Sequence, residues 1–134
     1  WLDKENFEIK TQLDDSITMK VDPEKLKQAF VNLIGNAIKY SGRTRKLDIR
    51  LFQQTEKVII EFADHGIGIP EKQLPRIFEK FYRADPKEGV SGTGLGLTVV
   101  KEIVAAHNGK IIVDSQVGKG SKFSIILYQK GAEV

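Results

Sequence analysis

Four polar side chains at helical spacing could together hold a metal ion, a phosphate and an aromatic base. They are Asn32, Asn36, Lys39 and Tyr40. Their spacing of i, i+4, i+7 and i+8 places them on one arc of an α-helix, apart from an apolar stripe. Amide oxygens suit a hard cation, an ammonium group suits phosphate, and a phenol ring can lie against a base. A solvated polar stripe is the alternative, although asparagine disfavours a helix interior.

A carboxylate and alternating glycines follow an apolar run that is predicted to be a strand. The segment reads Asp64-His65-Gly66-Ile67-Gly68-Ile69-Pro70. A carboxylate at the end of a strand can accept a hydrogen bond from the exocyclic amine of adenine, whereas guanine presents a carbonyl oxygen there. Gly66 and Gly68 allow the backbone to turn sharply and to approach a flat base. An ordinary Asp-Xaa-Gly turn is the alternative interpretation.

A third segment, Gly92-Thr93-Gly94-Leu95-Gly96-Leu97-Thr98, leads straight into a predicted helix. Successive backbone N–H groups at a helix N-terminus form a site for phosphate oxygens. The segment is not a Walker A loop, because no Gly-Lys-Ser/Thr follows, and its glycine spacing is not that of a Rossmann fingerprint. A flexible connector is the alternative.

Between the two glycine segments lies a run of aromatic and basic residues, Arg76-Ile77-Phe78-Glu79-Lys80-Phe81-Tyr82-Arg83. Its rings can anchor a short helix on the core, while Lys80 and Arg83 direct charge toward whatever the neighbouring loop covers. Taken alone, the run is more typical of a plain amphipathic turn.

The elements that must position these segments follow from hydrophobic periodicity and from turn residues. Residues 7–13 and 17–21 are predicted to form a hairpin around Asp14-Asp15-Ser16. A strand over residues 57–64 is apolar on both sides, which is typical of a central position in a sheet. Further strands are predicted at residues 47–53, 110–114 and 122–128, and helices at residues 23–41, 74–81 and 95–106. The order predicts an α/β two-layer sandwich with a mixed sheet.

The bulk composition is that of a single globular domain. The chain has 134 residues, of which 40% are hydrophobic and 29% are charged, with a net charge of +3 and no cysteine. Such a chain can bury a core, and it has no disulfide framework or thiolate chemistry. No apolar run is long enough to span a bilayer. Because the chain begins at Trp1 and its one methionine is Met19, we expect a fragment of a longer protein.

Taken in order, the four segments resemble the boxes of the histidine kinase branch of the GHKL ATPase superfamily. Residues 32–41 are similar to the N box, 64–70 to the G1 box, 76–83 to the F box and 92–97 to the G2 box. The resemblance implies the Bergerat fold: a mixed sheet of about five strands, about three helices on one face, and a mobile ATP lid. The lid is expected at about residues 84–92.

The resemblance also implies how the phosphates and the metal of Mg·ATP are held. Asn36 would coordinate Mg²⁺, and Asn32 would support the phosphate–metal cluster. Lys39 would contact a phosphate and Arg83 would reach the γ-phosphate, so Asn32, Lys39 and Arg83 are the expected catalytic positions. The glycine segment would wrap the triphosphate, with nucleotide contacts expected at Gly92, Thr93, Gly94, Leu95, Gly96 and Leu97.

For the base, the resemblance places Tyr40 beside the adenine and Asp64 on its amino group. Gly66 and Gly68 would shape the pocket, and Ser121 would help to fix the ring. The expected base contacts are thus Tyr40, Asp64, Gly66, Gly68, Ile69 and Ser121.

One position separates the branches of the superfamily. ATP-hydrolysing members and the anti-sigma serine kinases carry a glutamate at the first N-box position, whereas this chain has Asn32, which cannot accept a proton at neutral pH. The resemblance therefore implies a protein-histidine kinase catalytic domain that binds Mg·ATP without turning it over alone. The alternatives are another GHKL-type ATPase or serine kinase, and a degenerate binding module. A nucleic-acid binder, suggested only by Arg43, Arg45 and Lys46, ranks below these.

The nucleophile implied by the resemblance is absent from this chain. Neither His65 nor His107 is followed by the acidic residue and proline of a phosphoacceptor box, so both are expected to be structural. The implied partners are the histidine-bearing dimerisation domain of the same parent protein and a response regulator, with no nucleic acid. The parent is expected to be a homodimer that can be membrane-anchored, and this domain a cytoplasmic monomer.

Overall fold

The computed structural model describes residues 7–79 and 96–129. Its elements, in chain order, are β1 (Glu8–Leu13), α1 (Pro23–Lys39), β2 (Lys46–Gln54), β3 (Lys57–Asp64), the 3₁₀ helix η2 (Glu71–Arg76), α2 (Gly96–Ala106), β4 (Lys110–Gln116) and β5 (Gly120–Tyr128). No helix in this part of the chain combines the length and the apolar character needed to cross a membrane.

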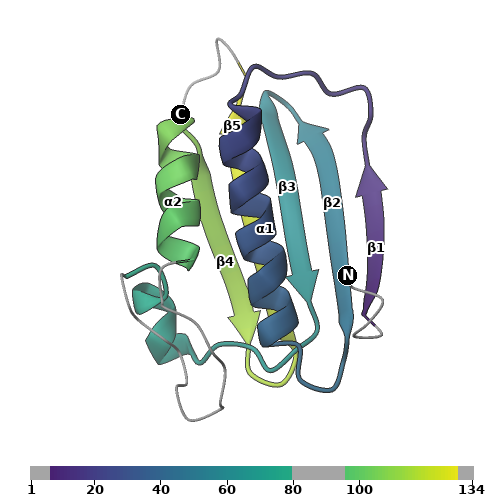
Figure 1. The fold of residues 1–134 in the computed structure, drawn as a ribbon, viewed down its shortest axis with the longest axis vertical. Coiled ribbons are helices and arrows are strands. Elements are labelled where there is room, and N and C mark those ends of the chain that lie inside the picture. The colour runs from purple at the N-terminus through teal and green to yellow at the C-terminus, as the bar shows by residue number, and fades with distance from the viewer. Residues whose placement is uncertain (1–6, 80–95, 130–134) are drawn as a thin grey trace.

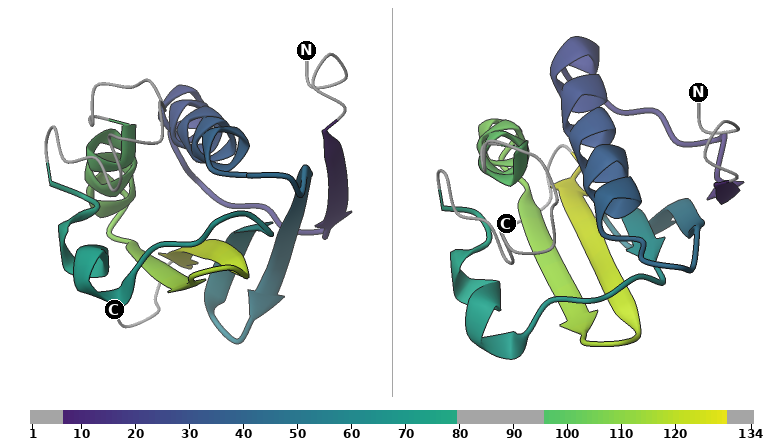
Figure 2. Two further views of the ribbon diagram at one scale, coloured as in Figure 1. Left: turned by 90° about the horizontal axis from the view of Figure 1, so that it is seen from below. Right: turned by 60° about the horizontal axis from the view of Figure 1, so that its bottom comes forward.

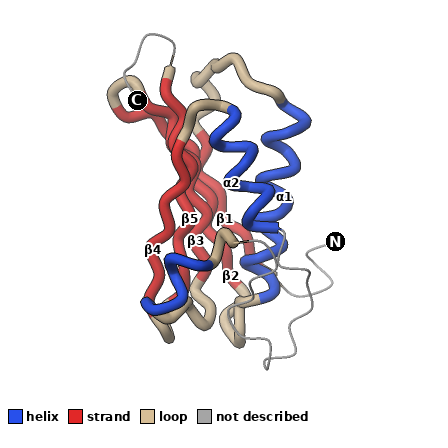
Figure 3. The backbone as a smooth tube through the Cα atoms, turned by 90° about the vertical axis from the view of Figure 1, so that its left-hand side faces the viewer, coloured by secondary structure: helices blue, strands red, loops and turns tan. Residues whose placement is uncertain are grey.

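The five strands form one mixed sheet in the order β1-β2-β3-β5-β4. β1 runs parallel to β2, and the other neighbours are antiparallel. Both α-helices lie on the same face of this sheet, as Figures 1 and 3 show. The predicted α/β two-layer sandwich with a mixed five-stranded sheet is confirmed, and β3 is its central strand.

The core lies between the helices and the inner face of the sheet. Alternate residues of β3, among them Ile60 and Phe62, point toward the helices and are buried. They meet the apolar stripe of α1, where Ala29 and Leu33 are buried, and the side of α2 that carries Val100. Apolar side chains recur every second residue in the strands and about every 3.6 residues in the helices. The apolar sides of both kinds of element therefore meet in one cluster.

The predicted hairpin over residues 7–21 is wrong. Residues 7–13 contain β1, but 17–21 form no strand, and β1 pairs instead with β2, from Glu8 opposite Lys46 to Leu13 opposite Leu51. The apolar residues of the connection, Ile17, Met19 and Val21, pack against the core as the chain crosses from β1 to α1. Their alternation reflects this packing, and it looks like a strand pattern although no second strand pairs with it.

The long helix α1 begins where its capping residues predict, and it ends at Lys39, two residues before the predicted end at Ser41. Asp22 Oδ1 accepts a hydrogen bond from Lys25 N at 3.1 Å, and Pro23 occupies the first turn. Gly42 has φ +61°, the predicted left-handed conformation, but it lies two residues after the C-cap Tyr40. The short helix predicted over 74–81 is η2, a 3₁₀ helix that begins three residues earlier and contains Pro75, which has no N–H to donate. The end of that predicted range lies outside the described residues.

The elements that carry the candidate site meet at one end of the sandwich, the lower end in Figure 1. β3 ends there at Asp64, β5 begins there at Gly120, α1 ends there and α2 begins there at Gly96. The view from below in Figure 2 shows the chain that follows β3 running across this end. The antiparallel arrangement of β3 and β5, with Ala63 opposite Lys122, thus brings Asp64 beside the start of β5.

Candidate functional site

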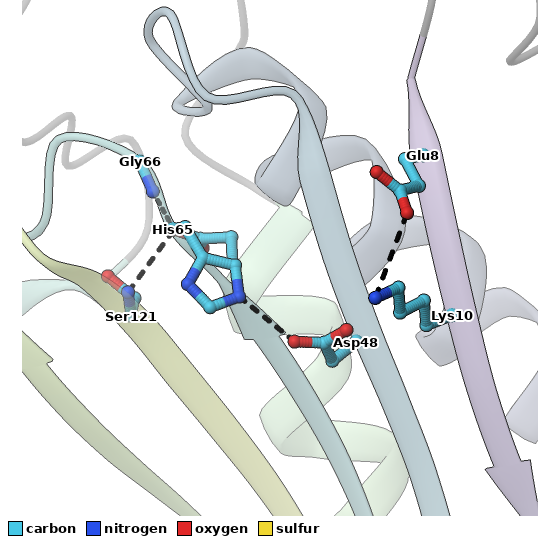
Figure 4. Close-up of polar contacts among 7 residues, drawn as sticks. Glu8, Lys10, Asp48, His65, Gly66 and Ser121 are labelled. Atoms are coloured by element: carbon cyan, nitrogen blue, oxygen red, sulfur yellow. Dashed lines mark hydrogen bonds and ion pairs between the residues drawn. The ribbon is translucent and has the colours of Figure 1, made fainter.

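The carboxylate of Asp64 is buried and is held by two backbone groups. The side chain is 7% exposed, at the end of the central strand. Its Oδ1 atom accepts hydrogen bonds from Gly66 N at 2.9 Å and from Ser121 N at 3.2 Å; Figure 4 draws both as dashed lines from the labelled Gly66 and Ser121. Among the described residues, no hydrogen bond reaches the second oxygen, Oδ2. One oxygen therefore anchors the side chain, and the other is free to accept from a ligand.

Burial changes the acidity of this group. Desolvation raises the pKa of the Asp64 carboxyl above the ordinary aspartate value, and the hydrogen bonds from Gly66 and Ser121 oppose that rise, followed by the nearby His65. A raised pKa means that the folded protein holds the ionised carboxylate at a cost. A buried charge with one unused oxygen is characteristic of a group kept for binding.

Three glycines around Asp64 permit backbone contacts that a side chain would block. A Cβ on Gly66 would lie 1.9 Å from Tyr40 O, at the end of α1. Gly68 has φ +77°, and a Cβ there would lie 2.2 Å from Gln116 O. Gly120 has φ +116°, and a Cβ there would lie 2.2 Å from Asp64 O. The predicted G1 segment is thus closely packed between α1 and the β4–β5 turn, where Ile67 N also donates to Tyr40 O at 3.0 Å.

Ser115, which the sequence analysis missed, connects the remaining pieces of this end. Its hydroxyl oxygen accepts from Ile69 N at 2.8 Å and lies 2.7 Å from Ser121 Oγ and 3.1 Å from Gly120 O. Ile69 and Ser121, both predicted base contacts, are therefore linked through Ser115. A signal was available, since Ser115 alternates with the partly buried Ile111 and Val113 on β4 and so shares their inner face.

The polar arc of α1 is connected to the start of α2. Asn32 Nδ2 donates to Gly96 O at 3.3 Å, which joins the predicted N box to the last glycine of the predicted G2 box. Asn36 is half-buried and Lys39 is exposed. Within residues 7–79 and 96–129, no hydrogen bond or ion pair joins the side chains of Asn36 and Lys39 to the Asp64 group. Tyr40 approaches that group through its carbonyl, which accepts from Ile67 N.

Several predicted positions lie outside the described residues: Arg83, Gly92, Thr93, Gly94 and Leu95. Of the glycine segment, Gly96 begins α2 and Leu97 packs against the core. Thr98, which closes the predicted glycine segment but was assigned no role, donates from Oγ1 to Phe78 O at 2.8 Å and so connects the first turn of α2 to the aromatic segment. The expected lid falls on the undescribed part of the chain.

Both histidines have partners within the fold. His65 Nε2 lies 2.9 Å from Asp48 Oδ2 on the sheet face opposite the helices, and both side chains are exposed (Figure 4). His107 Nδ1 donates to Ile103 O at 2.9 Å, and its Nε2 accepts from Asp22 N at 3.0 Å. This links the end of α2 to the N-cap of α1. Among the described residues, no three His, Cys, Asp or Glu side chains cluster as metal ligands would.

Comparison with known families gives one match that covers most of the chain. Residues 21–131 match the family described as histidine kinase-, DNA gyrase B-, and HSP90-like ATPase. The sensor protein kinase WalK of Staphylococcus haemolyticus is 40% identical over 117 residues, which are 84% of this chain and 19% of WalK. The signal transduction histidine-protein kinase ArlS of Staphylococcus aureus is 38% identical over 113 residues, 83% of this chain and 25% of ArlS. The chain thus spans a quarter or less of these relatives.

Solved structures share the fold over nearly the whole chain. The mycobacterial sensor histidine kinase MprB matches with a TM-score of 0.80 at 28% identity, over 94% of this chain and 84% of that one. The nucleotide-free catalytic domain of histidine kinase ThkA matches with a TM-score of 0.81 at 28% identity, over 96% and 82%. Full-length ShkA in complex with AMPPNP matches with a TM-score of 0.83 at 27% identity, over 98% of this chain and 28% of ShkA.

Proposed function

The chain belongs to the histidine kinase-, DNA gyrase B- and HSP90-like ATPase family, in its sensor histidine kinase branch, and on that premise we propose that it binds Mg·ATP and donates the γ-phosphate to a histidine. The histidine would be on the dimerisation domain of the same parent protein. The parent would act in a two-component system, as a homodimer that can be membrane-anchored, and would pass the phosphoryl group to a response regulator. This domain would lie in the cytoplasm.

The observation that carries the proposal is the buried Asp64 carboxylate with one unused oxygen. Gly66 N and Ser121 N fix Oδ1, so Oδ2 has a defined position at the end of β3. A carboxylate oxygen can only accept, which suits the exocyclic amine of adenine and disfavours the carbonyl of guanine. The close backbone packing at Gly66 and Gly68 would offer a rigid wall to a flat ring.

The triphosphate would lie toward the polar arc of α1 and the start of α2. Asn36 would supply an amide oxygen to Mg²⁺, an ion that takes few protein ligands and binds substrate phosphates as well. When bound, Mg²⁺ supplies charge neutralisation at the phosphate oxygens. Lys39, which is exposed, would contact a phosphate, and Asn32 donates to Gly96 O at the start of α2. Arg83 and the glycine segment 92–97 would complete the site.

The chemistry assigned to this domain is positioning and charge neutralisation, which is most of what phosphoryl transfer requires of a protein. Asn32 stands where a general base would be needed to activate water or serine, and an amide cannot take a proton at neutral pH. The domain would therefore hold ATP ready for an imidazole supplied by its partner, and it would hydrolyse ATP negligibly alone.

Two measurements test the proposal. Titration calorimetry of the purified chain with Mg·ADP should show one-to-one binding, and the chain alone should release almost no phosphate from ATP. Addition of the dimerisation domain from a relative such as ArlS should give ATP-dependent labelling of its histidine. Rapid hydrolysis by the chain alone would favour an ATPase of the same family, and absence of nucleotide binding would favour a degenerate module.

A further inference from the structure

We propose that Ser115 is a positioning residue that sets the preference of the base pocket for a 6-amino purine over a 6-oxo purine. This inference rests on the proposed nucleotide binding at Asp64. Ser115 lies on β4, outside all four of the recognised sequence boxes. Its hydroxyl is the point at which the G1 segment, the start of β5 and Ser121 meet.

The proton positions around Ser115 follow from its three neighbours. Ile69 N–H can only donate, so Ser115 Oγ accepts it at 2.8 Å. Gly120 O can only accept, so it takes the Ser115 hydroxyl proton at 3.1 Å. The remaining contact, 2.7 Å to Ser121 Oγ, is then filled by the Ser121 hydroxyl as donor. This is the one arrangement that satisfies all three contacts, and it occupies the Ser121 proton.

The consequence is a base pocket that offers acceptors. Ser121 is also connected to Asp64, because its backbone N–H donates to Asp64 Oδ1 at 3.2 Å. Because the Ser121 hydroxyl donates to Ser115, only the lone pairs of Ser121 Oγ remain available to a ligand. On Asp64, the acceptor that remains available is Oδ2. An amino group with two N–H donors fits such a pair, whereas a 6-oxo group finds no donor.

Loss of the Ser115 hydroxyl would change this pattern in a specific way. The Ser121 proton would no longer have a partner and could turn to donate to a ligand. Ile69 N–H would lose its acceptor, so the G1 segment would be held less firmly at that residue. Adenine nucleotides should therefore bind less tightly, and nucleotides of hypoxanthine should lose less or gain.

The test compares substitutions of Ser115 that keep or remove the hydroxyl at matched shape. Ser115→Thr retains the hydroxyl, and Ser115→Val has nearly the same shape without it. Ser124→Ala is the control, because Ser124 is a buried serine on the adjacent strand that faces the other side of the sheet from Ser115. Mg·ADP and Mg·IDP are titrated into each protein by calorimetry, and thermal unfolding is recorded without nucleotide.

We expect Ser115→Val to weaken Mg·ADP binding about tenfold, the size of a lost hydrogen bond in a partly buried site, and to lower the ADP-to-IDP affinity ratio. Ser115→Thr and Ser124→Ala should keep both affinities near wild type. An unchanged ratio in Ser115→Val, with both nucleotides weakened equally or not at all, would overturn the inference while leaving the proposed function intact. If Ser115→Val does not fold, Ser115→Ala gives the same comparison. Failure of the wild-type chain to bind Mg·ADP would remove the proposed function and this inference together.

Discussion

The two parts of the candidate site differ in how much of their structure the protein itself supplies. The base end, formed by Asp64, Gly66, Gly68, Ser115 and Ser121, is held by hydrogen bonds and by backbone contacts that leave no room for a Cβ at either glycine. The phosphate end, formed by Asn32, Asn36, Lys39 and Gly96, has one side-chain hydrogen bond among its described residues, from Asn32 to Gly96 O.

This difference indicates which interactions are ready before a ligand arrives. A base is uncharged and flat, so recognising it requires acceptors and donors in fixed positions, and a rigid pocket loses little entropy on binding. Phosphates and Mg²⁺ bring their own charges and ligands, and they can order exposed side chains such as Lys39 around them. We therefore expect substitutions at the base end to have larger effects than those at the phosphate end.

The largest effect is expected from Gly66→Ala. A Cβ at this position would lie 1.9 Å from Tyr40 O, and the obstructing atom is backbone, so α1 or the G1 segment must shift. Overpacking of this kind should lower the free energy of unfolding by about 3 kcal/mol. Chemical denaturation of the nucleotide-free chain measures this change in the free energy of unfolding.

Gly35→Ala is the matched control within α1. Nothing lies within 4 Å of a Cβ built at Gly35, and alanine is the better helix former, so this change should raise the free energy of unfolding by about 1 kcal/mol. Equal effects of the two substitutions would contradict the close packing described for the G1 segment.

Asp64→Asn should separate binding from stability. One amide oxygen can still accept from Gly66 and Ser121, but an NH₂ group would then replace the free oxygen and oppose the amine of adenine. Mg·ADP affinity should fall by about 2 kcal/mol, roughly 30-fold. Stability at neutral pH should not fall, because a buried charge is removed. Calorimetry and thermal unfolding on the same samples distinguish a specific loss of nucleotide binding from a loss of folded structure.

The raised pKa of Asp64 predicts the pH dependence of binding and of stability. Because the carboxylate must be ionised to accept from adenine, Mg·ADP affinity should be full above the folded-state pKa and should decline below it, by up to about tenfold per pH unit. The decline should begin at a higher pH than an ordinary aspartate would give. The contribution of this group to stability has the opposite sign, since it is present at low pH and is lost as pH rises through the folded-state pKa. A calorimetric pH series with Asp64→Asn as reference, which should lack this decline, measures the effect.

The smallest effect is expected from Asn32→Ala at the phosphate end. The substitution removes one exposed hydrogen bond to Gly96 O, so the free energy of unfolding should fall by less than about 1 kcal/mol. Mg·ADP affinity should change only a few-fold, whereas histidine labelling of an added dimerisation domain should fall further. A loss of Mg·ADP affinity as large as that of Asp64→Asn would contradict the difference between the two ends.

The fold could be predicted from the sequence where the signal is local. The bounds of β3 and the caps of α1 depend on periodicity and on residues such as Asp22, Pro23 and Gly42, all within a few positions of the element. The partner of β1 could not be predicted in this way. An apolar alternation over residues 17–21 is the same whether it faces a second strand or packs on a core formed by distant residues.

In the candidate site, too, residues with a local sequence signal were predicted and residues whose role depends on tertiary contacts were not. Asp64 and Gly66 were predicted from the segment after the central strand and Ser121 from the resemblance, and the fold brings the three into contact. Ser115 and Gly120 were not predicted as site residues, because their roles depend on tertiary contacts, one with Ile69 N and the other with the carbonyl of Asp64. Serine in a strand and glycine in a turn are too common to indicate such contacts by type alone.

The hydrogen bond from Asp22 N to His107 has a mechanical consequence for the two helices. It fastens α1 to α2 at the end far from the site, while the next link, Asn32 to Gly96, lies ten residues along α1, or about 15 Å at the helical rise. With the far link acting as a pivot, a rotation of α1 by about 5° would displace its Asn32 by somewhat over 1 Å. A small angular adjustment of α1 would thus become a change of spacing where the phosphates are expected to lie.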